Sequence, residues 1–375
     1  MEQGTRTRVA TLVAQRMTRN LRRVLCSLLV AWAIGSPAAS FAADLSSPLA
    51  ELQSRLDSAA NHAPGRVGIA VEDLATGLTT GVNAGSSLPA ASTIKIPVMV
   101  EVFRQMAEGS IDLNTRLHLQ ESDRDDGWGD MAYAPANTAR SVEQLLRLMI
   151  DDSDNTATNM LIRLVGRQKV NSTMSELGLH DTTLGDYIRS ATDGIRYSLR
   201  SSPRDMVKLL DSIARRRLVD AWSSGEMLAI LTGQTHNGLL PAPLPKKLQI
   251  AHKTGSLHDT LNDVGIVFRA NEPYVIAVMT TQLPSLPMGR RFIHDVSKLT
   301  YDEFGRFALW REGEGLPGFT LGMAAPTTGT TSSSLAPDLQ MWNASGSTAP
   351  LPLPETDQQP ETPLPPAADP EDPGN

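Results

Sequence analysis

Three short elements of the sequence carry side chains suited to nucleophilic chemistry. The first is Ser92-Thr93-Ile94-Lys95, where a spacing of three places a serine and a lysine on one face of a predicted helix. A serine hydroxyl is a weak nucleophile until a neighbouring base accepts its proton, and a buried lysine with a lowered pKa can do so. On its own, the motif is more typical of a capping serine followed by a solvated lysine.

The other two elements are Ser153-Asp154-Asn155 and Lys253-Thr254-Gly255-Ser256. The Ser-Asp-Asn run is by itself typical of a polar turn between helices, because these side chains hydrogen-bond their own backbone. A glycine inside a strand marks close approach of a ligand or another backbone, and a lysine in front of it can hold a carboxylate. An edge strand that happens to carry a lysine is the ordinary alternative. The occurrence of all three elements in this order is far rarer in protein sequences than the occurrence of any one of them.

The periodicity of apolar residues predicts the elements that carry these motifs. Helices are predicted at residues 45–60, 92–108, 141–165, 202–217 and 290–310, and strands at 67–74, 79–82, 248–256, 262–268 and 274–281. This order predicts an α+β fold, in which an antiparallel sheet is built from both ends of the folded body and flanked by helices, with a mainly helical subdomain in the middle.

Composition divides the 375 residues into three regions. Residues 1–42 hold six arginines and one acidic residue, followed by an apolar run and small residues, which predicts a secretory signal peptide cleaved after Ala42. Residues 43–325 are the predicted folded domain. Residues 326–375 contain 11 of the 25 prolines and seven acidic residues but no Lys or Arg, which predicts an acidic, Pro-rich, disordered tail.

Several functional classes are disfavoured by the same composition. The net charge is −7, and no block of basic residues lies beyond the N-terminal region, so the sequence predicts no positively charged surface for binding nucleic acid. The apolar run 24–34 is too short to span a bilayer, so we expect no stable membrane anchor and a periplasmic or secreted protein. Cys26, the single cysteine, lies in the predicted signal, and the histidines form no metal-binding pair, so we expect no cofactor and no metal.

The ordered trio S-x-x-K, S-D-N and K-T-G resembles the signature of class A β-lactamases and penicillin-binding proteins. The resemblance extends over about residues 45–312, and Pro97, Thr156 and the run 262–266 also agree with it. It implies a β-lactamase-like serine hydrolase. Its substrate would be a small-molecule β-lactam or a peptidoglycan stem peptide.

The resemblance also implies a role for each matching residue. Ser92 would be the acylated nucleophile, Lys95 its proton partner, and Ser153 a relay of the proton toward the leaving nitrogen. The backbone N–H groups of Ser92 and Ser256 would form the oxyanion hole.

The same resemblance implies which residues bind substrate. Asn155 would bind the side-chain amide of the substrate. Lys253, Thr254 and Ser256 would hold its carboxylate, with Gly255 in the same binding element. Trp128 resembles the aromatic residue at the lip of such sites, although a partly buried loop tryptophan is an equal alternative.

One expected part of the pattern is missing. True class A β-lactamases carry, in an Ω-shaped loop, a glutamate followed four residues later by an asparagine, which position the water that hydrolyses the acyl-enzyme. The corresponding residues 184–194 contain neither. One count along the chain places Asp186 there and another places Ile188, while Asp193 is a second candidate. Asp186 is equally typical of a loop or capping carboxylate. Because aspartate is one methylene shorter than glutamate, deacylation through Asp186 would be slow.

Three functions therefore compete. The leading one is an exported β-lactamase-like hydrolase that opens β-lactam rings through an acyl-enzyme on Ser92. The alternative is a penicillin-binding D-Ala-D-Ala peptidase that β-lactams acylate with slow deacylation, which the missing glutamate favours. The third is a non-catalytic cell-wall binding module, against which the intact Ser92, Lys95, Ser153 and Lys253 argue.

Overall fold

The computed structural model describes residues 38–190 and 198–313. These residues belong to the first of two units of the chain, Met1–Ala324 and Ala325–Asn375. Three sequence predictions fall outside the described residues: the signal peptide up to residue 37, Asp193 and the Pro-rich tail 326–375.

A five-stranded antiparallel sheet with strand order β2-β1-β10-β9-β8 lies at the centre of the fold. Strands β1 (Arg66–Asp73) and β2 (Thr79–Val82) come from the N-terminal part, and β8 (Ile250–Leu257), β9 (Thr260–Val267) and β10 (Tyr274–Thr281) from the C-terminal part. Every residue of β9 and β10 is buried, as expected for β-branched strands covered on both faces. The prediction of an antiparallel sheet built from both ends of the body is confirmed.

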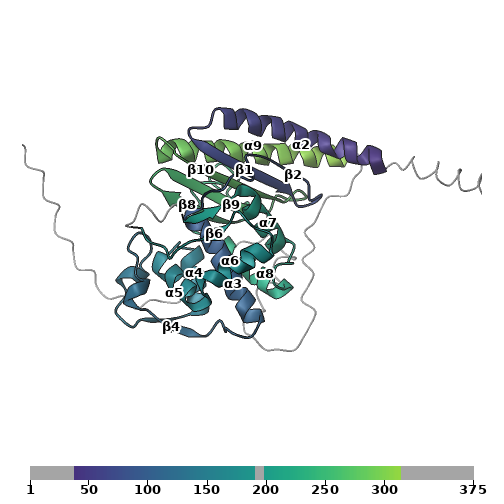
Figure 1. The fold of residues 1–375 in the computed structure, drawn as a ribbon. Coiled ribbons are helices and arrows are strands. Elements are labelled where there is room, and N and C mark those ends of the chain that lie inside the picture. Colours follow the sequence, from purple (N-terminus) through teal and green to yellow (C-terminus); the bar gives the residue numbers. More distant parts are fainter. Residues whose placement is uncertain (1–37, 191–197, 314–375) are drawn as a thin grey trace, which may run out of the picture. The chain divides into compact units, whose positions relative to one another are not determined.

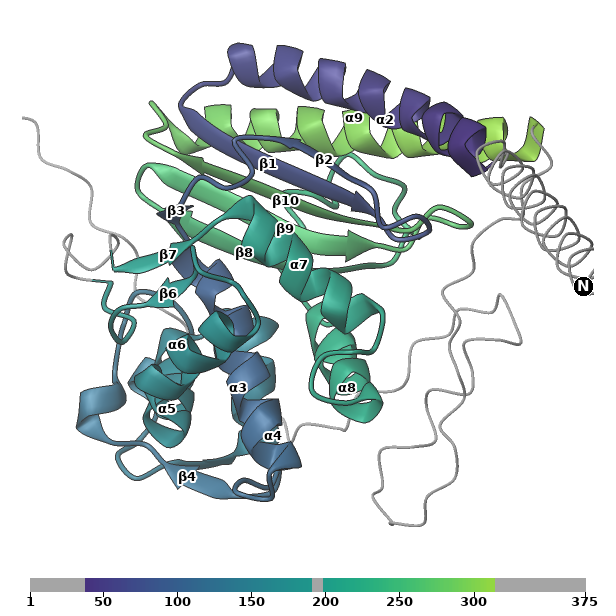
Figure 2. The same ribbon diagram turned by 45° about the vertical axis from the view of Figure 1, so that its right-hand side comes forward.

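Two long helices, α2 (Ala38–Asn61) and α9 (Leu286–Gly313), lie side by side across one face of this sheet (Figures 1 and 2). Their apolar residues form a core with the sheet that includes Leu52, Leu56 and Ile293, all fully buried. Helix α9 begins four residues before the predicted start at 290. This start places Pro287 in the first turn, where the missing N–H of proline costs no helical hydrogen bond.

The opposite face of the sheet is covered by a helical layer (Figure 2). Its elements are η1 (Ala91–Ile94), α3 (Lys95–Ala107), α4 (Val142–Ile150), α5 (Asn155–Val165), α6 (Arg167–Glu176), α7 (Pro203–Ala214) and α8 (Ala221–Thr232). The predicted helix 141–165 is in fact two helices, because Ser153 has a left-handed backbone with φ of 62° that no helix continues through. Ser141 and Gln144 form the reciprocal cap that their spacing predicts.

Short strands in this layer were not predicted. They are β3 (Leu88–Pro89), β4 (Arg116–His118), β5 (Ala139–Ser141), β6 (Thr183–Leu184) and β7 (Leu199–Ser201), accompanied by the 3-10 turns η2 (Glu121–Asp123) and η3 (Met131–Tyr133). Strands of two or three residues have too little alternation of apolar and polar side chains to be recognised in a sequence.

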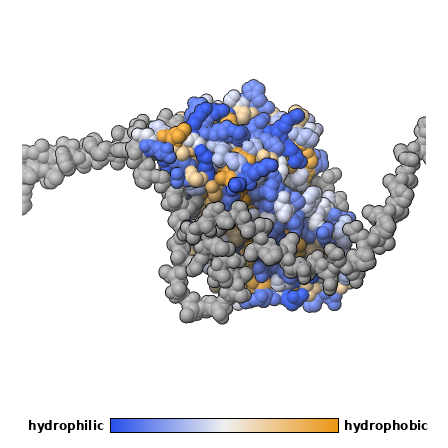
Figure 3. Space-filling model, turned by 180° about the vertical axis from the view of Figure 1, so that it is seen from behind, coloured by the Kyte–Doolittle hydropathy of each residue, from blue (hydrophilic) through white to orange (hydrophobic). Residues whose placement is uncertain are grey.

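The outer surface of the described residues is largely hydrophilic on the face shown in Figure 3, with hydrophobic side chains scattered among polar ones. Within residues 38–190 and 198–313, no helix combines the length and apolar character needed to cross a membrane.

Candidate active site

Ser92 lies in the turn η1, where the chain enters α3, and its hydroxyl is hydrogen-bonded to none of the described residues. The preceding residue, Ala91, has a φ of 47°, a conformation that a residue with a Cβ rarely adopts. Asn262 of β9 holds this turn, because its buried amide donates to the carbonyls of Pro89 and Ala90 at 2.9 and 3.0 Å. The nucleophile candidate therefore lies on a strained turn fixed to the sheet.

Lys95, the first residue of α3, is fully buried beside the loop that precedes α5. Its Nζ donates to the backbone carbonyl of Ser153 at 2.5 Å, to the Ser153 Oγ at 3.1 Å and to the Asn155 Oδ1 at 2.8 Å. The fold thus brings the first two sequence motifs into direct contact.

Ser153 stands between two lysines. Its Oγ is 3.1 Å from Lys95 Nζ and accepts a hydrogen bond from Lys253 Nζ at 3.0 Å, while Lys253 Nζ also donates to the Thr254 carbonyl at 3.1 Å. Its left-handed backbone points the hydroxyl and the carbonyl of one residue toward the same lysine. The third motif, on the edge strand β8, therefore joins the first two through one hydroxyl.

Burial of both lysines changes their protonation. Loss of water, and then the positive charge of Lys253, hold the pKa of Lys95 well below its usual value. Burial lowers the pKa of Lys253 to about 7, against the opposing effect of the carboxylates of Asp263 and Asp151. Lys95 is therefore suited to accept a proton, while Lys253 can still carry the charge that attracts an anion near neutral pH.

Gly255 of β8 packs directly on the turn that holds the nucleophile. A Cβ at this position would lie 3.0 Å from both the Ala90 carbonyl oxygen and the Ser92 nitrogen, so only glycine fits without displacing backbone. Close approach at a strand glycine is what the sequence predicted. It brings the backbone of Ser92 beside the strand that continues into Ser256, an exposed residue, while Thr254 is half-buried.

Asn155 is held on both ends of its side-chain amide. Its Oδ1 accepts from Lys95, and its Nδ2 donates to Asp125 Oδ1 at 2.7 Å and to Ser190 Oγ at 3.0 Å. These two acceptors are only 2.6 Å apart, so they lie on the same side of the nitrogen and share one N–H. No other described residue accepts a hydrogen bond from the Asn155 Nδ2. Asp125 and Ser190 were not singled out in the sequence, where they carry no motif.

Trp128 is an exposed residue at the edge of this cluster, with 55% of its surface accessible. Its indole N–H donates to the Asp152 carbonyl at 2.9 Å, and its backbone carbonyl accepts from the Asn155 N–H at 2.9 Å. Its ring meets the imidazole of His236 edge-on, with ring centroids 5.4 Å apart. His236 was not predicted as part of the site, because nothing in the local sequence links it to the tryptophan.

Asp186 lies away from these contacts. Its carboxylate accepts from the backbone N–H of Tyr187 at 2.7 Å and pairs with Arg167 at 3.5 Å, and 47% of its side chain is exposed. Ile188 is buried, and its backbone N–H and carbonyl are both held by the amide of Asn159 at 2.8 and 3.0 Å. The structure therefore brings Lys95, Ser153, Asn155 and Lys253 together and gives Asp186 other partners.

The assembled groups suit acyl transfer. A serine hydroxyl with no hydrogen-bond partner among the described residues, a buried lysine with a lowered pKa and a second hydroxyl between two lysines are groups that nucleophilic attack and proton transfer can use. In the described part of the chain, no three His, Cys, Asp or Glu side chains are grouped as metal ligands would be.

Known proteins with similar sequences or structures include β-lactamases. The chain is 30% identical over 233 residues to a β-lactamase of Streptomyces lavendulae, covering 58% of this chain and 73% of that protein. It is similar to a solved mutant of PBP-A in an acyl-enzyme complex with penicillin G, with 31% identity, a TM-score of 0.65 and coverage of 69% and 97% of the two chains. A β-lactamase structure from Sphaerobacter thermophilus shares 30% identity with a TM-score of 0.63, over 68% and 97% of the two chains.

The family comparison covers all three motifs. Residues 51–304 match the family model described as the Beta-lactamase enzyme family, which is more than half of the chain. With the β-lactamase fold and the site geometry described above, this match confirms the resemblance inferred from the motifs. The chain belongs to the Beta-lactamase enzyme family.

Proposed function

We propose that this protein opens β-lactam rings through an acyl-enzyme on Ser92. The Ser92 Oγ attacks the lactam carbonyl carbon while its proton passes to Lys95. The C–N bond then breaks, the ring nitrogen takes a proton through Ser153, and an ester remains on Ser92 until water hydrolyses it. The observation that carries this proposal is the buried Lys95–Ser153–Lys253 network in the same fold as a serine hydroxyl that no described residue hydrogen-bonds.

Electrostatics support this order of steps. A lysine acts as a base only when it is neutral, and burial beside the charge of Lys253 favours neutral Lys95. The Ser153 hydroxyl lies 3.1 Å from Lys95 Nζ and 3.0 Å from Lys253 Nζ, so it can pass a proton from one side of the scissile bond to the other. Lys253 would also attract the carboxylate that most β-lactams carry.

Deacylation is proposed to be the slow step. The described part of the loop, residues 184–190, contains one carboxylate, Asp186, and its partners are Arg167 and a backbone N–H. This favours, as a second candidate, a penicillin-binding peptidase that acts on the D-Ala-D-Ala end of peptidoglycan stems and is acylated by β-lactams. The similarity to a PBP-A mutant solved as an acyl-enzyme with penicillin G supports acylation by β-lactams in both candidates.

Intact-mass spectrometry of the purified protein with excess benzylpenicillin tests the proposal. We expect a single adduct with the mass of the opened drug, absent in Ser92→Ala. An adduct that clears within minutes as drug is consumed supports the β-lactamase, and one that persists for hours supports the peptidase. Absence of both an adduct and drug consumption in the wild-type protein would contradict both.

A peptide substrate separates the two enzymes further. A stem peptide ending in D-Ala-D-Ala should release D-Ala in a Ser92-dependent reaction if the peptidase is correct. A β-lactamase is expected to leave the peptide intact while it hydrolyses benzylpenicillin repeatedly.

Export is proposed from the N-terminal sequence alone. We propose that residues 1–42 direct secretion and are removed after Ala42, a position that falls within the first turns of α2. N-terminal sequencing of the protein from a periplasmic extract should find Ala43 first. Full-length protein in the cytoplasmic fraction would contradict it.

A further inference from the structure

We infer that Asp125 is a positioning residue for acylation, because its buried carboxylate fixes the side-chain amide of Asn155 and places a negative charge near Lys95. The inference rests on the proposed acylation of Ser92 and assigns a function to a residue outside the three motifs. It concerns acylation only, so it holds for either candidate enzyme.

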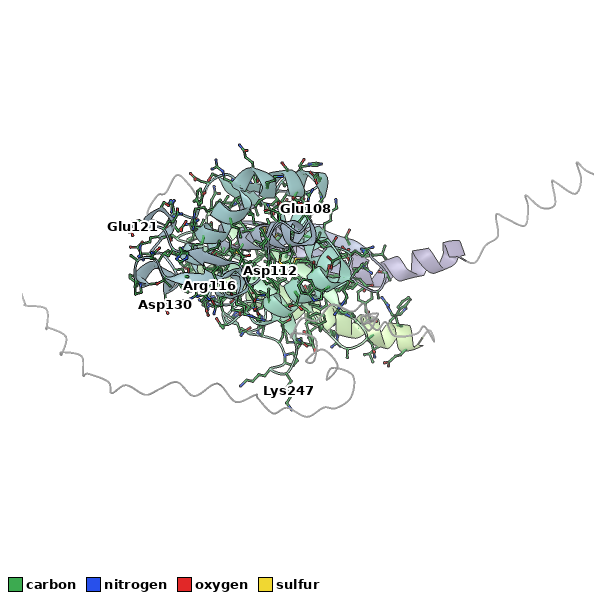
Figure 4. All side chains as sticks on the ribbon, turned by 90° about the horizontal axis from the view of Figure 1, so that it is seen from below. Glu108, Asp112, Arg116, Glu121, Asp130 and Lys247 are labelled. Carbon is green, nitrogen blue, oxygen red and sulfur yellow. The ribbon has the colours of Figure 1, made fainter. Side chains whose placement is uncertain are left out.

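The contacts of Asp125 separate it from the acidic residues around it. Its Oδ1 accepts from the Asn155 Nδ2 at 2.7 Å and the Ser190 Oγ at 2.6 Å, and its Oδ2 accepts from the Ser190 backbone N–H at 2.6 Å. By contrast, Glu121 and Asp130, which flank the same loop, project outward at the rim of the helical layer in Figure 4. Asp123, the other buried carboxylate of this loop, pairs with Arg163, so Asp125 is the loop carboxylate that turns inward to Asn155.

An ionised carboxylate determines which way the Asn155 amide faces. Asp125 accepts hydrogen bonds and donates none, so the NH2 end of the amide turns toward it. The Oδ1 end then faces Lys95, which donates to it at 2.8 Å. A flipped amide would place NH2 against the Lys95 amine and a carbonyl against the carboxylate. The unshared N–H of Asn155 is left in the orientation needed for a substrate carbonyl.

Asp125 stays ionised in this environment. Burial raises the pKa of its carboxyl, but hydrogen bonds from the Ser190 hydroxyl, the Ser190 backbone and Asn155 outweigh burial, and the net shift is downward. The carboxylate is thus a fixed negative charge across the pH range in which a lysine of low pKa titrates.

Charged groups face Lys95 from three elements. Lys253 on β8 lowers the pKa of Lys95, after burial, while Asp154 at the start of α5 and Asp125 in the loop before Trp128 raise it. Removing the charge of Asp125 therefore lowers the pKa of Lys95 further. The acylation rate should fall at low pH as Lys95 gains a proton, and this fall is the acid limb of the pH profile. Without the charge of Asp125, the acid limb should move to lower pH.

The test is the pH profile of the acylation rate with benzylpenicillin for Asp125→Asn. In this variant a side-chain NH2 faces groups that donate hydrogen bonds to Asp125 in the wild-type protein, so the Asn155 amide loses its fixed orientation. We expect the acylation rate on the pH-independent plateau to fall about tenfold to a hundredfold. We also expect the acid limb to shift down by about half a pH unit or more. A limb at the wild-type pH, or a plateau rate within twofold of wild type, would overturn the inference.

Two control variants separate positioning from general effects. Asp123→Asn removes a buried carboxylate from the same loop, but that carboxylate pairs with Arg163 at 2.9 Å and contacts neither Asn155 nor Lys95. Asp126→Asn removes an exposed charge one residue away. The acid limb of both control variants should lie at the wild-type pH. This holds even if Asp123→Asn lowers the melting temperature, because loss of stability alone does not change the pKa of Lys95. A limb shift in either control equal to that of Asp125→Asn would contradict the specific role.

Further variants keep the test decisive. Ser190→Ala retains the charge of Asp125, so its acid limb should stay in place while the plateau rate falls by a few fold. If Asp125→Asn does not fold, Asp125→Ala removes the same charge without the opposed NH2 and should show the same limb shift. Failure of wild-type protein to be acylated would reject the proposed function itself, whereas acylation with unaltered profiles in these variants rejects only the inference.

Discussion

The side of the site that would form an acyl-enzyme differs sharply from the side that would hydrolyse it. On the acylation side, Lys95, Ser153 and Lys253 are buried and lie within 3.1 Å of their partners, and they come from α3, the loop before α5 and the edge strand β8. On the loop side, residues 184–190 offer one acidic side chain, Asp186, half-exposed and paired with Arg167.

Under the proposed function, this difference means that one fold can maintain the two half-reactions separately. Acylation depends on groups held by helix starts and by an edge strand, which the core of the fold fixes. Deacylation in class A enzymes depends on a carboxylate in a surface loop, where sequence changes cost little stability. A chain can therefore keep the first set of groups and lose the second without losing its fold.

Replacing Lys95 should produce the largest effect, because it removes proton transfer from the acylation side of the comparison. Lys95→Ala removes the proposed base, so we expect the rate of adduct formation to fall about a hundredfold to ten-thousandfold. Stopped-flow or quenched mass spectrometry measures it, with circular dichroism to confirm folding. A rate within fivefold of wild type would show that another group accepts the Ser92 proton.

Lys253→Met should weaken binding of substrates that carry a carboxylate while stabilising the fold. Losing the charge partner should raise the apparent KM about thirtyfold or more. Burial lowers the pKa of Lys253 to about 7 in the folded protein, whereas its value in the unfolded chain is about 10.5. Burying the charged lysine therefore lowers the free energy of unfolding by its full amount below pH 7. This penalty decreases as pH rises from about 7 to about 10.5 and is absent above that range. The variant should therefore melt at a higher temperature at pH 7, and an unchanged KM would contradict the assignment.

The pH dependence of wild-type binding follows from the same group. Because free Lys253 loses its charge as pH rises through about 7, the KM for benzylpenicillin should increase above that pH by up to about tenfold per unit. An ester substrate without a carboxylate is the matched control, and its KM should stay flat. Parallel changes for both substrates would assign the pH effect to another group.

Gly255→Ala should have a smaller effect, because it disturbs the position of the nucleophile without removing a reacting group. The added Cβ would meet the Ala90 carbonyl and the Ser92 nitrogen at 3.0 Å, so the turn must move by a few tenths of an ångström. We expect acylation to slow about tenfold. The control variant Gly109→Ala adds a Cβ that meets nothing within 4 Å but strains a backbone with φ of 75°, so it should lower the melting temperature and leave acylation unaltered.

Asp186→Asn should have the smallest effect and sharpens the comparison on the loop side. Since the Asp186 carboxylate is paired with Arg167 at the surface, we expect the lifetime of the acyl-enzyme to change less than about twofold. Loss of the pulsed adduct, followed by mass spectrometry after removal of free drug, measures it. A lifetime lengthened tenfold would restore Asp186 as the deacylating base.

Much of this architecture could be predicted from the sequence, because its signals are strong and local. The β-branched runs predict β1, β2, β9 and β10 to within two residues at each end, and the strand glycine Gly255 marks the close approach to Ser92. The resemblance carried by the three ordered motifs implies which residues meet, and none of the motifs would predict it alone.

The remainder depended on contacts that no local pattern encodes. Asp125 lies in an acidic run that resembles a solvated loop, and only the fold shows that its carboxylate turns inward to Asn155 and Ser190. His236 meets Trp128 across a long separation in sequence. Asp186 was a candidate from counting alone, and counting along a loop does not determine where a side chain points.

The most direct test of the central claim is to measure acylation and deacylation separately in one protein. Rapid mixing with benzylpenicillin should give a burst of one opened drug per chain, absent in Ser92→Ala, followed by turnover at least about a hundredfold slower than the burst. This result would establish an intact acylation side and a defective deacylation side. Linear hydrolysis from the first turnover, with no burst and no accumulated adduct, would contradict the account.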